Sequence, residues 1–408
     1  MPALIAARGR RWVAVLLAFV VVGSASSAWA ASTLTPELVQ LGRKIFADES
    51  LSASGKMSCA TCHDPKFGHA QNNELAVQSG GASLDVPGFR SVPSLRYLNF
   101  NTPFFFASDG TPTGGFNRDG RANTLVEQAE RPFLAAHEMA NGDATSLVDK
   151  LSRASYADAF RSMFGADVFA RVDTAFLAAR YALSVYESTA SEFRPFSSKY
   201  DLFLKGKLKL SAQELRGYVL FNNPNKGRCA ACHLSTRQAN GDPPVFTDYT
   251  YDNLGVPRNA AIPANADPLY FDMGLCGPER TDLANRRDLC GQFKVPTLRN
   301  VATRKVIFHN GYFKSLREAL EFYVQRDTSP QKWYPLDAAG AVLKFNDVPP
   351  LLARNVNTSE GPYNRHPGEA PALSDIEIDD VMAFLATLTD GYDPVTNTAD
   401  PARDVPAQ

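Results

Sequence analysis

Two copies of one five-residue pattern constrain the fold of this chain more than any other feature. Residues 59–63 (CATCH) and 229–233 (CAACH) both follow C-x-x-C-H, with a histidine directly after the second cysteine. This spacing is typical of covalent haem attachment, because two thiols three residues apart can form thioethers to one porphyrin. One copy alone would also suit a redox-active cysteine pair or half of a zinc site. Two copies predict a fold built around two haem c groups.

Each motif supplies its own attachment and iron-binding residues. The expected thioethers form at Cys59 and Cys62 in the first motif and at Cys229 and Cys232 in the second. The histidine after each pair is then held under the iron as its proximal ligand. The expected proximal ligands are His63 and His233.

The first thirty residues have the composition of an export signal. Three arginines, at positions 8, 10 and 11, precede an apolar run over 12–22, and an A-x-A cleavage site ends at Ala30. The apolar run is too short to cross a bilayer as a helix. We therefore expect cleavage near Ala30, no membrane attachment afterwards, and a location in the periplasm, where c-type haem is attached. A retained N-terminal anchor is the alternative.

The net charge of the chain limits the kinds of macromolecule that it is expected to bind. The chain carries a net charge of −1, which becomes −4 once the three leader arginines are removed. Such a mildly acidic protein is a poor match for nucleic acid, and its charge is too small to predict a basic redox partner. The remaining length of about 378 residues is enough for two domains with ordinary cores.

Two of the six cysteines lie outside the haem motifs. Leftover cysteines usually pair in an oxidising compartment, so we expect a disulfide between Cys276 and Cys290. On the chain-entropy model, closing a loop of about 15 residues stabilises the fold by roughly 3 kcal/mol.

Helical periodicity dominates the regular part of the sequence. Apolar residues recur at three- and four-residue spacings over 145–152, 156–164 and 172–190. Capping boxes of the type Ser/Thr-x-x-Glu, which mark helix N-termini, begin at Thr124, Ser211, Ser315 and Ser374. Strand signals are few and short. These patterns predict a mainly α fold, with two cytochrome c-like haem domains and long loops.

The expected domain boundary lies in a basic, aromatic connector over 193–207. Residues 31–205 would form an N-terminal haem domain, and residues 206–390 a C-terminal one. The polar tail over 391–408 is expected to fray, as chain ends without packing partners usually do.

Four stretches of the sequence resemble the bacterial di-haem cytochrome c peroxidase family, which includes MauG. They are residues 57–65, 119–139, 293–300 and 308–311, and they occur in the family's order. The resemblance implies an N-terminal haem that reacts with hydrogen peroxide and a C-terminal haem that stores or relays an electron.

The same resemblance implies that Gln128 and Glu138 form the peroxide pocket. Cleavage of the O–O bond needs a group that moves a proton from the inner to the outer oxygen, and a carboxylate near the iron can do this. An amide can hold the bound oxygen by a hydrogen bond. Without the resemblance, both residues would be interpreted as solvated helix residues.

One departure from the family concerns the far side of the first haem. By spacing back from Arg90, the distal histidine of peroxidases that need reductive activation falls at about Ser83, and residues 80–88 contain no histidine. We therefore expect the first haem to have no second protein ligand. His69 is a substitute, but it lies only six residues after His63 and would struggle to reach the opposite face of the ring.

A second departure concerns the axial ligand of the C-terminal haem. The family commonly has Met fourteen residues after the histidine that matches His309, and this count ends at Tyr323, where MauG also has Tyr. The capping box at Ser315 places Tyr323 on the inward face of its helix. An anionic oxygen ligand favours oxidised iron, whereas Met raises the potential. A core tyrosine with a hydrogen-bonded hydroxyl is the alternative.

Arg118 stands where the family has a tryptophan between the haems. Hole transfer between the haems cannot then use an indole at this position. Tyr97, Phe104, Phe105 or direct transfer between the haem edges would have to serve instead.

The resemblance also implies a calcium site between the haems. The side-chain ligand would be Ser91, where the family usually has Asn, and the backbone donors would be the carbonyls of Arg304 and Val306. Because backbone carbonyls survive any substitution, calcium binding stays open.

The leading functional interpretation is a hydrogen-peroxide-dependent di-haem oxidoreductase. One version is a detoxifying peroxidase that takes electrons from a small cytochrome c or cupredoxin. The other oxidises Trp or Tyr side chains on a partner protein, as MauG does; Tyr323 and the missing distal histidine favour it, and the lost tryptophan weakens it. A di-haem electron carrier is the non-enzymatic alternative, and Glu138 argues against it because a carrier has no use for a carboxylate beside the iron.

Overall fold

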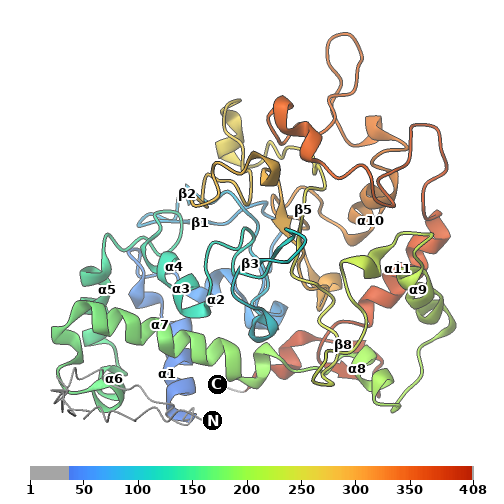
Figure 1. Cartoon of the computed structure of the whole chain (residues 1–408). Helices are drawn as coiled ribbons and strands as arrows, with labels where there is room; N and C mark the ends of the chain where they lie inside the picture. Colours follow the sequence, from blue (N-terminus) through green and yellow to red (C-terminus); the bar gives the residue numbers. More distant parts are fainter. Residues whose placement is uncertain (1–35, 407–408) are drawn as a thin grey trace, which may run out of the picture. The chain divides into compact units, whose positions relative to one another are not determined.

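Helices account for most of the regular structure of residues 36–406, the part of the chain that the computed structural model describes (Figure 1). The helices are α1 (Pro36–Ala47), α2 (Cys59–Cys62), α3 (Leu125–Gln128), α4 (Glu130–Leu134), α5 (Ala144–Arg153), α6 (Ala157–Phe164), α7 (Val172–Thr189), α8 (Lys199–Leu204), α9 (Ala212–Asn222), α10 (Leu316–Gln325) and α11 (Asp375–Ala386). The fold is mainly α, as predicted, and the expected export signal lies outside the described residues. None of the helices within 36–406 is long and apolar enough to cross a membrane.

The strands are short and lie in four antiparallel pairs, β1–β2, β3–β4, β5–β6 and β7–β8. They are β1 (Ser79–Gly80), β2 (Val86–Pro87), β3 (Phe105–Phe106), β4 (Pro112–Thr113), β5 (Tyr251–Asp252), β6 (Phe293–Lys294), β7 (Tyr392–Asp393) and β8 (Thr398–Ala399). Each pair is a separate two-stranded sheet that holds loops in place, and none of the four joins another within residues 36–406.

The first core forms where α1 packs against α7 (Figure 1). The two helices approach closely at Gly42, where an added Cβ would lie 2.1 Å from the carbonyl oxygen of Ala182 on α7. Any larger residue would therefore push the helices apart. The core takes its buried residues from 38–193 and packs against Cys59 of the first haem motif.

A second pair of helices, α9 and α11, also cross at a glycine that allows a close approach (Figure 1). An added Cβ at Gly217 on α9 would lie 1.9 Å from the carbonyl oxygen of Asp380 on α11. Both helices begin with the predicted capping boxes, in which Ser211 and Ser374 accept a backbone N–H from the third helical residue. The second core takes its buried residues from 200–388 and packs against Cys229 of the second motif.

The structure differs from the sequence-based expectation at two places. The connector over 193–207 contains helix α8, which starts with a capping box formed by Ser198 and Asp201. The tail after residue 390 does not fray within the described residues, because β7 and β8 pair and the buried Arg96 donates to the carbonyl of Pro401 at 2.9 Å. The guanidinium also pairs with Asp390 at 2.9 Å, so it ties the tail to the first haem region.

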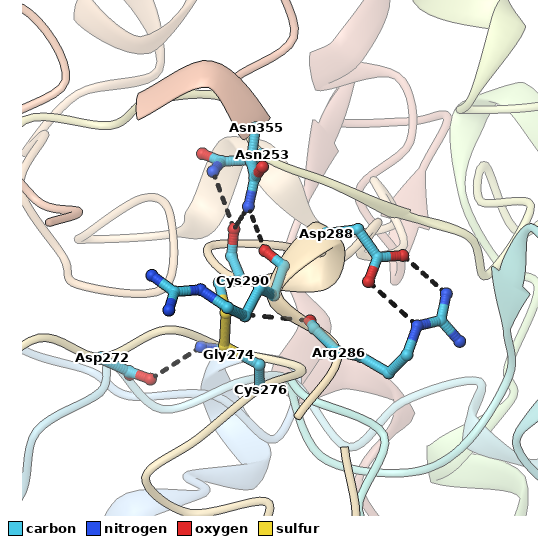
Figure 2. Close-up of a disulfide and its surroundings, with 9 residues drawn as sticks. Asn253, Asp272, Gly274, Cys276, Arg286, Asp288, Cys290 and Asn355 are labelled. Atoms are coloured by element: carbon cyan, nitrogen blue, oxygen red, sulfur yellow. Dashed lines mark hydrogen bonds and ion pairs between the residues drawn. A yellow bond between two sulfur atoms is a disulfide. The ribbon is translucent and has the colours of Figure 1, made fainter. Parts of the chain in front are cut away.

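Cys276 and Cys290 form a disulfide in the long loop region after the second motif (Figure 2). The carbonyl of Cys290 accepts a hydrogen bond from Asn253 at 3.3 Å. Asp272, shown in the same view, pairs with Arg90 at 2.6 Å. The loop closed by the disulfide therefore begins just after Asp272, the carboxylate that pairs with Arg90 from a distant part of the sequence.

Candidate functional site

One cavity of about 430 Å³ touches both C-x-x-C-H motifs. Its lining includes all six motif residues that the sequence singles out: Cys59, Cys62, His63, Cys229, Cys232 and His233. The four cysteines form no disulfide with one another. Apolar walls with paired thiols beside a histidine fit a covalently attached haem at each motif.

The two motif histidines are oriented for metal binding by backbone carbonyls. His63 Nδ1 lies 3.1 Å from the carbonyl oxygen of Pro93 and 3.3 Å from that of His69. His233 Nδ1 lies 2.9 Å from the carbonyl oxygen of Phe246. Because a carbonyl only accepts, Nδ1 carries the proton and Nε2 keeps its lone pair for iron. Burial lowers the pKa of His63 to about 4 and lowers the pKa of His233, so both rings are neutral and suited to bind a metal.

His69 does not reach the cavity. Its ring is fully buried, packs against Phe193 with the ring centroids 4.0 Å apart, and is absent from the cavity lining. Its carbonyl holds the His63 ring from the proximal side. Residues 80–88 are likewise absent from the lining. Among the described residues, neither of the two expected positions brings a histidine to the far side of the first haem site.

Gln128 and Glu138 both line the cavity. Gln128 is the last residue of α3, and Glu138 follows α4 in a turn where its backbone N–H donates to the carbonyl of Ala135 at 2.9 Å. The backbone at Glu138 is packed closely, because an added Cβ at Gly80 would lie 2.4 Å from the Glu138 carbonyl oxygen and the Gly81 N–H donates to it at 2.9 Å. Burial raises the pKa of Glu138.

Tyr323 lies on α10 and lines the same cavity as the second motif. Its ring lies 5.5 Å from that of Phe308 and 6.2 Å from that of Tyr363, measured between centroids. Its hydroxyl forms no hydrogen bond with any residue of 36–406, and burial raises its pKa. This leaves the hydroxyl free to act as an axial ligand, but the hydroxyl of Tyr249, which also lines the cavity, is buried without a partner as well.

Arg118 lies beside Ser91, the residue expected to bind calcium. The guanidinium donates to the Ser91 carbonyl at 3.1 Å and to its hydroxyl at 2.7 Å, and that hydroxyl donates to the carbonyl of Phe308 at 2.7 Å. The pKa of Arg118 is lowered to about 9, mainly by burial. The nearby guanidinium groups of Arg304 and Arg90 lower it further. A calcium ion would have to displace a cation and face two more. The residues as arranged do not fit calcium.

The aromatic side chains offered as substitutes for the missing tryptophan lie in different places. Tyr97 lines the cavity and donates its hydroxyl hydrogen to Asp390 at 2.6 Å. Phe104 packs under Arg280, 3.8 Å from ring centroid to guanidinium carbon, and Phe105 is 46% exposed. Neither phenylalanine lines the cavity.

Glu187, Lys294 and Tyr363 are among the lining residues that sequence reasoning did not single out. Glu187 lies in the middle of the apolar pattern of α7, Lys294 lies in a two-residue strand, and Tyr363 lies in a loop without periodicity. Burial raises the pKa of Glu187 to about 8 and lowers that of Lys294 to about 7. For Glu187, the available signal was a charged residue within the apolar pattern of a helix. The sequence carries no comparable signal for Lys294 or Tyr363.

Comparison with known proteins identifies the family of this chain. Residues 36–209 match the family model described as di-haem cytochrome c peroxidase. The methylamine utilization protein MauG of Paracoccus denitrificans is 34% identical over 390 residues, which cover 92% of this chain and 95% of the relative. The cytochrome c551 peroxidase of Pseudomonas aeruginosa is 30% identical over 284 residues, covering 69% and 70%. The crystal structure of the diheme peroxidase BthA from Burkholderia thailandensis aligns with a TM-score of 0.81 at 37% identity, covering 90% of both chains.

Two haem motifs on a mainly α fold with one shared cavity define a c-type di-haem protein. The relatives make the assignment narrower: the chain belongs to the di-haem cytochrome c peroxidase family that includes MauG. It is an oxidoreductase of the haem peroxidase type, with two haem c cofactors.

Proposed function

We propose that this chain is a periplasmic enzyme that reacts with hydrogen peroxide at the haem of His63 and holds or relays an oxidising equivalent at the haem of His233 and Tyr323. The shared cavity gives the main support, because Gln128 and Glu138 line it with the first motif and Tyr323 with the second. The bound haems supply the electrons that cleave the peroxide O–O bond.

The protein contributes proton movement and positioning. The raised pKa of Glu138 suits its carboxylate to take a proton from one peroxide oxygen and return it to the other. The Gln128 amide can donate a hydrogen bond to the oxygen that stays near the iron. Because the close packing at Gly80 fixes the backbone of Glu138, the carboxylate needs little reorganisation when it acts.

The two cores support an organisation into two haem domains. The core over 38–193 packs against Cys59, and the core over 200–388 packs against Cys229. On this basis we propose an N-terminal peroxide-reactive domain over 31–205 and a C-terminal electron-transfer domain over 206–390.

A small cytochrome c or cupredoxin is the proposed electron donor, and steady-state turnover tests this. Purified holoprotein is mixed with hydrogen peroxide and each reduced donor, and donor oxidation is followed by absorbance. We expect two donor molecules to be oxidised for each peroxide reduced to water. Failure to consume peroxide with or without a donor would leave only a di-haem electron carrier.

Oxidation of Trp or Tyr side chains on a partner protein is a second candidate function. It is favoured by the hydroxyl of Tyr323, which faces the cavity without a hydrogen-bond partner among residues 36–406, and by the MauG relative, which spans nearly the whole chain. Tyr323→Phe should then change the spectrum and potential of the second haem, and Tyr323→Met should raise that potential. Tyr363→Phe, a neighbouring cavity residue, is the matched control. An unchanged second haem in Tyr323→Phe would make Tyr323 a core residue and remove the support.

A further inference from the structure

Three partly buried basic side chains line the cavity without a carboxylate within ion-pair distance among the described residues: Arg118, Lys294 and Arg304. Each is only partly exposed, and each is held by neutral oxygens. Arg118 donates to Ser91, Lys294 to the carbonyl of Gly115, and one nitrogen of Arg304 has no partner at all.

The other basic residues of the lining do not share this environment. Arg96 pairs with Asp390 at 2.9 Å, and Arg299 pairs with Asp201 at 2.6 Å. Arg228 is exposed and can be solvated by water. Among the described basic residues of the lining, the combination of partial burial and no counter-charge is therefore found at Arg118, Lys294 and Arg304.

These three cations lie between the two proximal histidines. Three successive backbone carbonyls accept hydrogen bonds here. The carbonyl of residue 91 accepts from Arg118 at 3.1 Å, that of residue 92 from Arg304 at 2.5 Å, and that of residue 93 from His63 at 3.1 Å. The backbone N–H of Lys294 donates to the carbonyl of Arg118 at 2.9 Å.

The connection continues from Lys294 toward the second motif. Val295, the next residue, accepts a hydrogen bond from the Thr247 hydroxyl at 2.7 Å. Residue 247 directly follows Phe246, whose carbonyl orients His233. One hydrogen-bonded path therefore joins the supports of both iron-binding histidines, and the cations lie along it.

Buried cations without a counter-charge are costly, so a ligand that enters this cavity should bring anions to them. Each haem carries two propionate carboxylates, and guanidinium and ammonium groups are the side chains that bind carboxylates best. We propose that Arg118, Lys294 and Arg304 form a binding strip for haem propionates between the two haem sites. The strip rests on the proposal that both motifs carry haem, which the mass and absorbance of the purified protein establish separately.

Reduction potentials test the strip in the intact holoprotein. Arg118→Gln, Lys294→Gln and Arg304→Gln each remove one positive charge, and Arg153→Gln removes one from an exposed helix position as the control. Loss of a nearby cation favours ferric iron, so we expect each cavity variant to lower the potential of at least one haem. A tenfold change in the reduction equilibrium corresponds to about 59 mV for one electron. Arg118→Lys should retain most of the wild-type potential.

Potentials in all three cavity variants that match the Arg153→Gln control would overturn the proposal. If the variants fail to take up two haems, a crystal structure of the wild-type holoprotein decides the question. Propionate oxygens within about 4 Å of the side-chain nitrogens of the strip support it. Propionates that contact none of the three residues contradict it.

Discussion

Glu138 and Glu187 show how differently two carboxylic acids behave on the walls of one cavity. Burial raises the pKa of Glu138, and the nearby Arg121 and Arg131 pull it back toward its ordinary value. Glu187 has no such neighbour, one of its oxygens is buried without a hydrogen bond, and burial raises its pKa to about 8. Glu138 is thus suited to exchange protons, whereas Glu187 is mostly protonated at neutral pH.

Glu138→Gln should slow the reaction with hydrogen peroxide by roughly 10²–10⁴-fold, the usual contribution of a positioned acid–base group. The amide keeps the shape of the side chain but cannot take up a proton. Stopped-flow absorbance of the holoprotein measures the rate, and haem content should not change. Glu127→Gln, an exposed residue next to Gln128, should react at the wild-type rate. A loss of less than threefold in Glu138→Gln would mean that another group or water moves the proton.

Glu187 should make the folded protein less stable as the pH rises. Its folded pKa of about 8 lies above the ordinary value of 4.5, so the folded state holds a proton that the unfolded state releases. The free energy of unfolding therefore falls between pH 4.5 and 8, by up to about 1.4 kcal/mol per pH unit. Glu187→Gln should reduce this slope in urea unfolding at pH 5 and pH 8. Equal slopes in both proteins would contradict the raised pKa and would mean that another group interacts with the Glu187 carboxylate in solution.

Among the elements, the starts of the helices could be predicted from local sequence patterns, whereas the ordered structure of the C-terminal tail could not. The capping boxes at Ser211, Ser315 and Ser374 marked α9, α10 and α11 because hydroxyl and backbone N–H lie within one turn of each other. The tail is ordered by Arg96, which is about 300 residues away in the sequence. No local pattern could have predicted that contact.

Replacing both cysteines of the disulfide by serine should lower the free energy of unfolding by about 3 kcal/mol, the value expected for a loop of this length. The pair closes a sequence separation of 14 residues, directly after the segment that carries Asp272 (Figure 2). Urea unfolding of the holoprotein compares the double variant with the wild type. Equal stability would show that the hydrogen bonds from Asn253 and Asn355 hold the loop without the disulfide.

At the scale of the whole molecule, spacing alone predicted the haem attachment residues, whereas Gln128, Glu138 and Tyr323 followed from the family resemblance. A C-x-x-C-H motif carries its own ligand, and the cavity contains both motifs, Gln128, Glu138 and Tyr323. The resemblance placed Arg118 between the haems, but its grouping with the side chains of Lys294 and Arg304 was not predictable, because the three residues come from separate segments and meet only in the folded chain. A lone basic residue in a loop has no signal that distinguishes a buried cation from a solvated one.

The most direct test concerns the far side of the His63 haem in the oxidised protein. Electron paramagnetic resonance of the ferric protein as isolated should show a high-spin signal, because neither His69 nor residues 80–88 line the cavity. One equivalent of hydrogen peroxide should remove that signal without prior reduction. Two low-spin signals with no high-spin component, and a reaction that begins only after reduction, would contradict the proposed site.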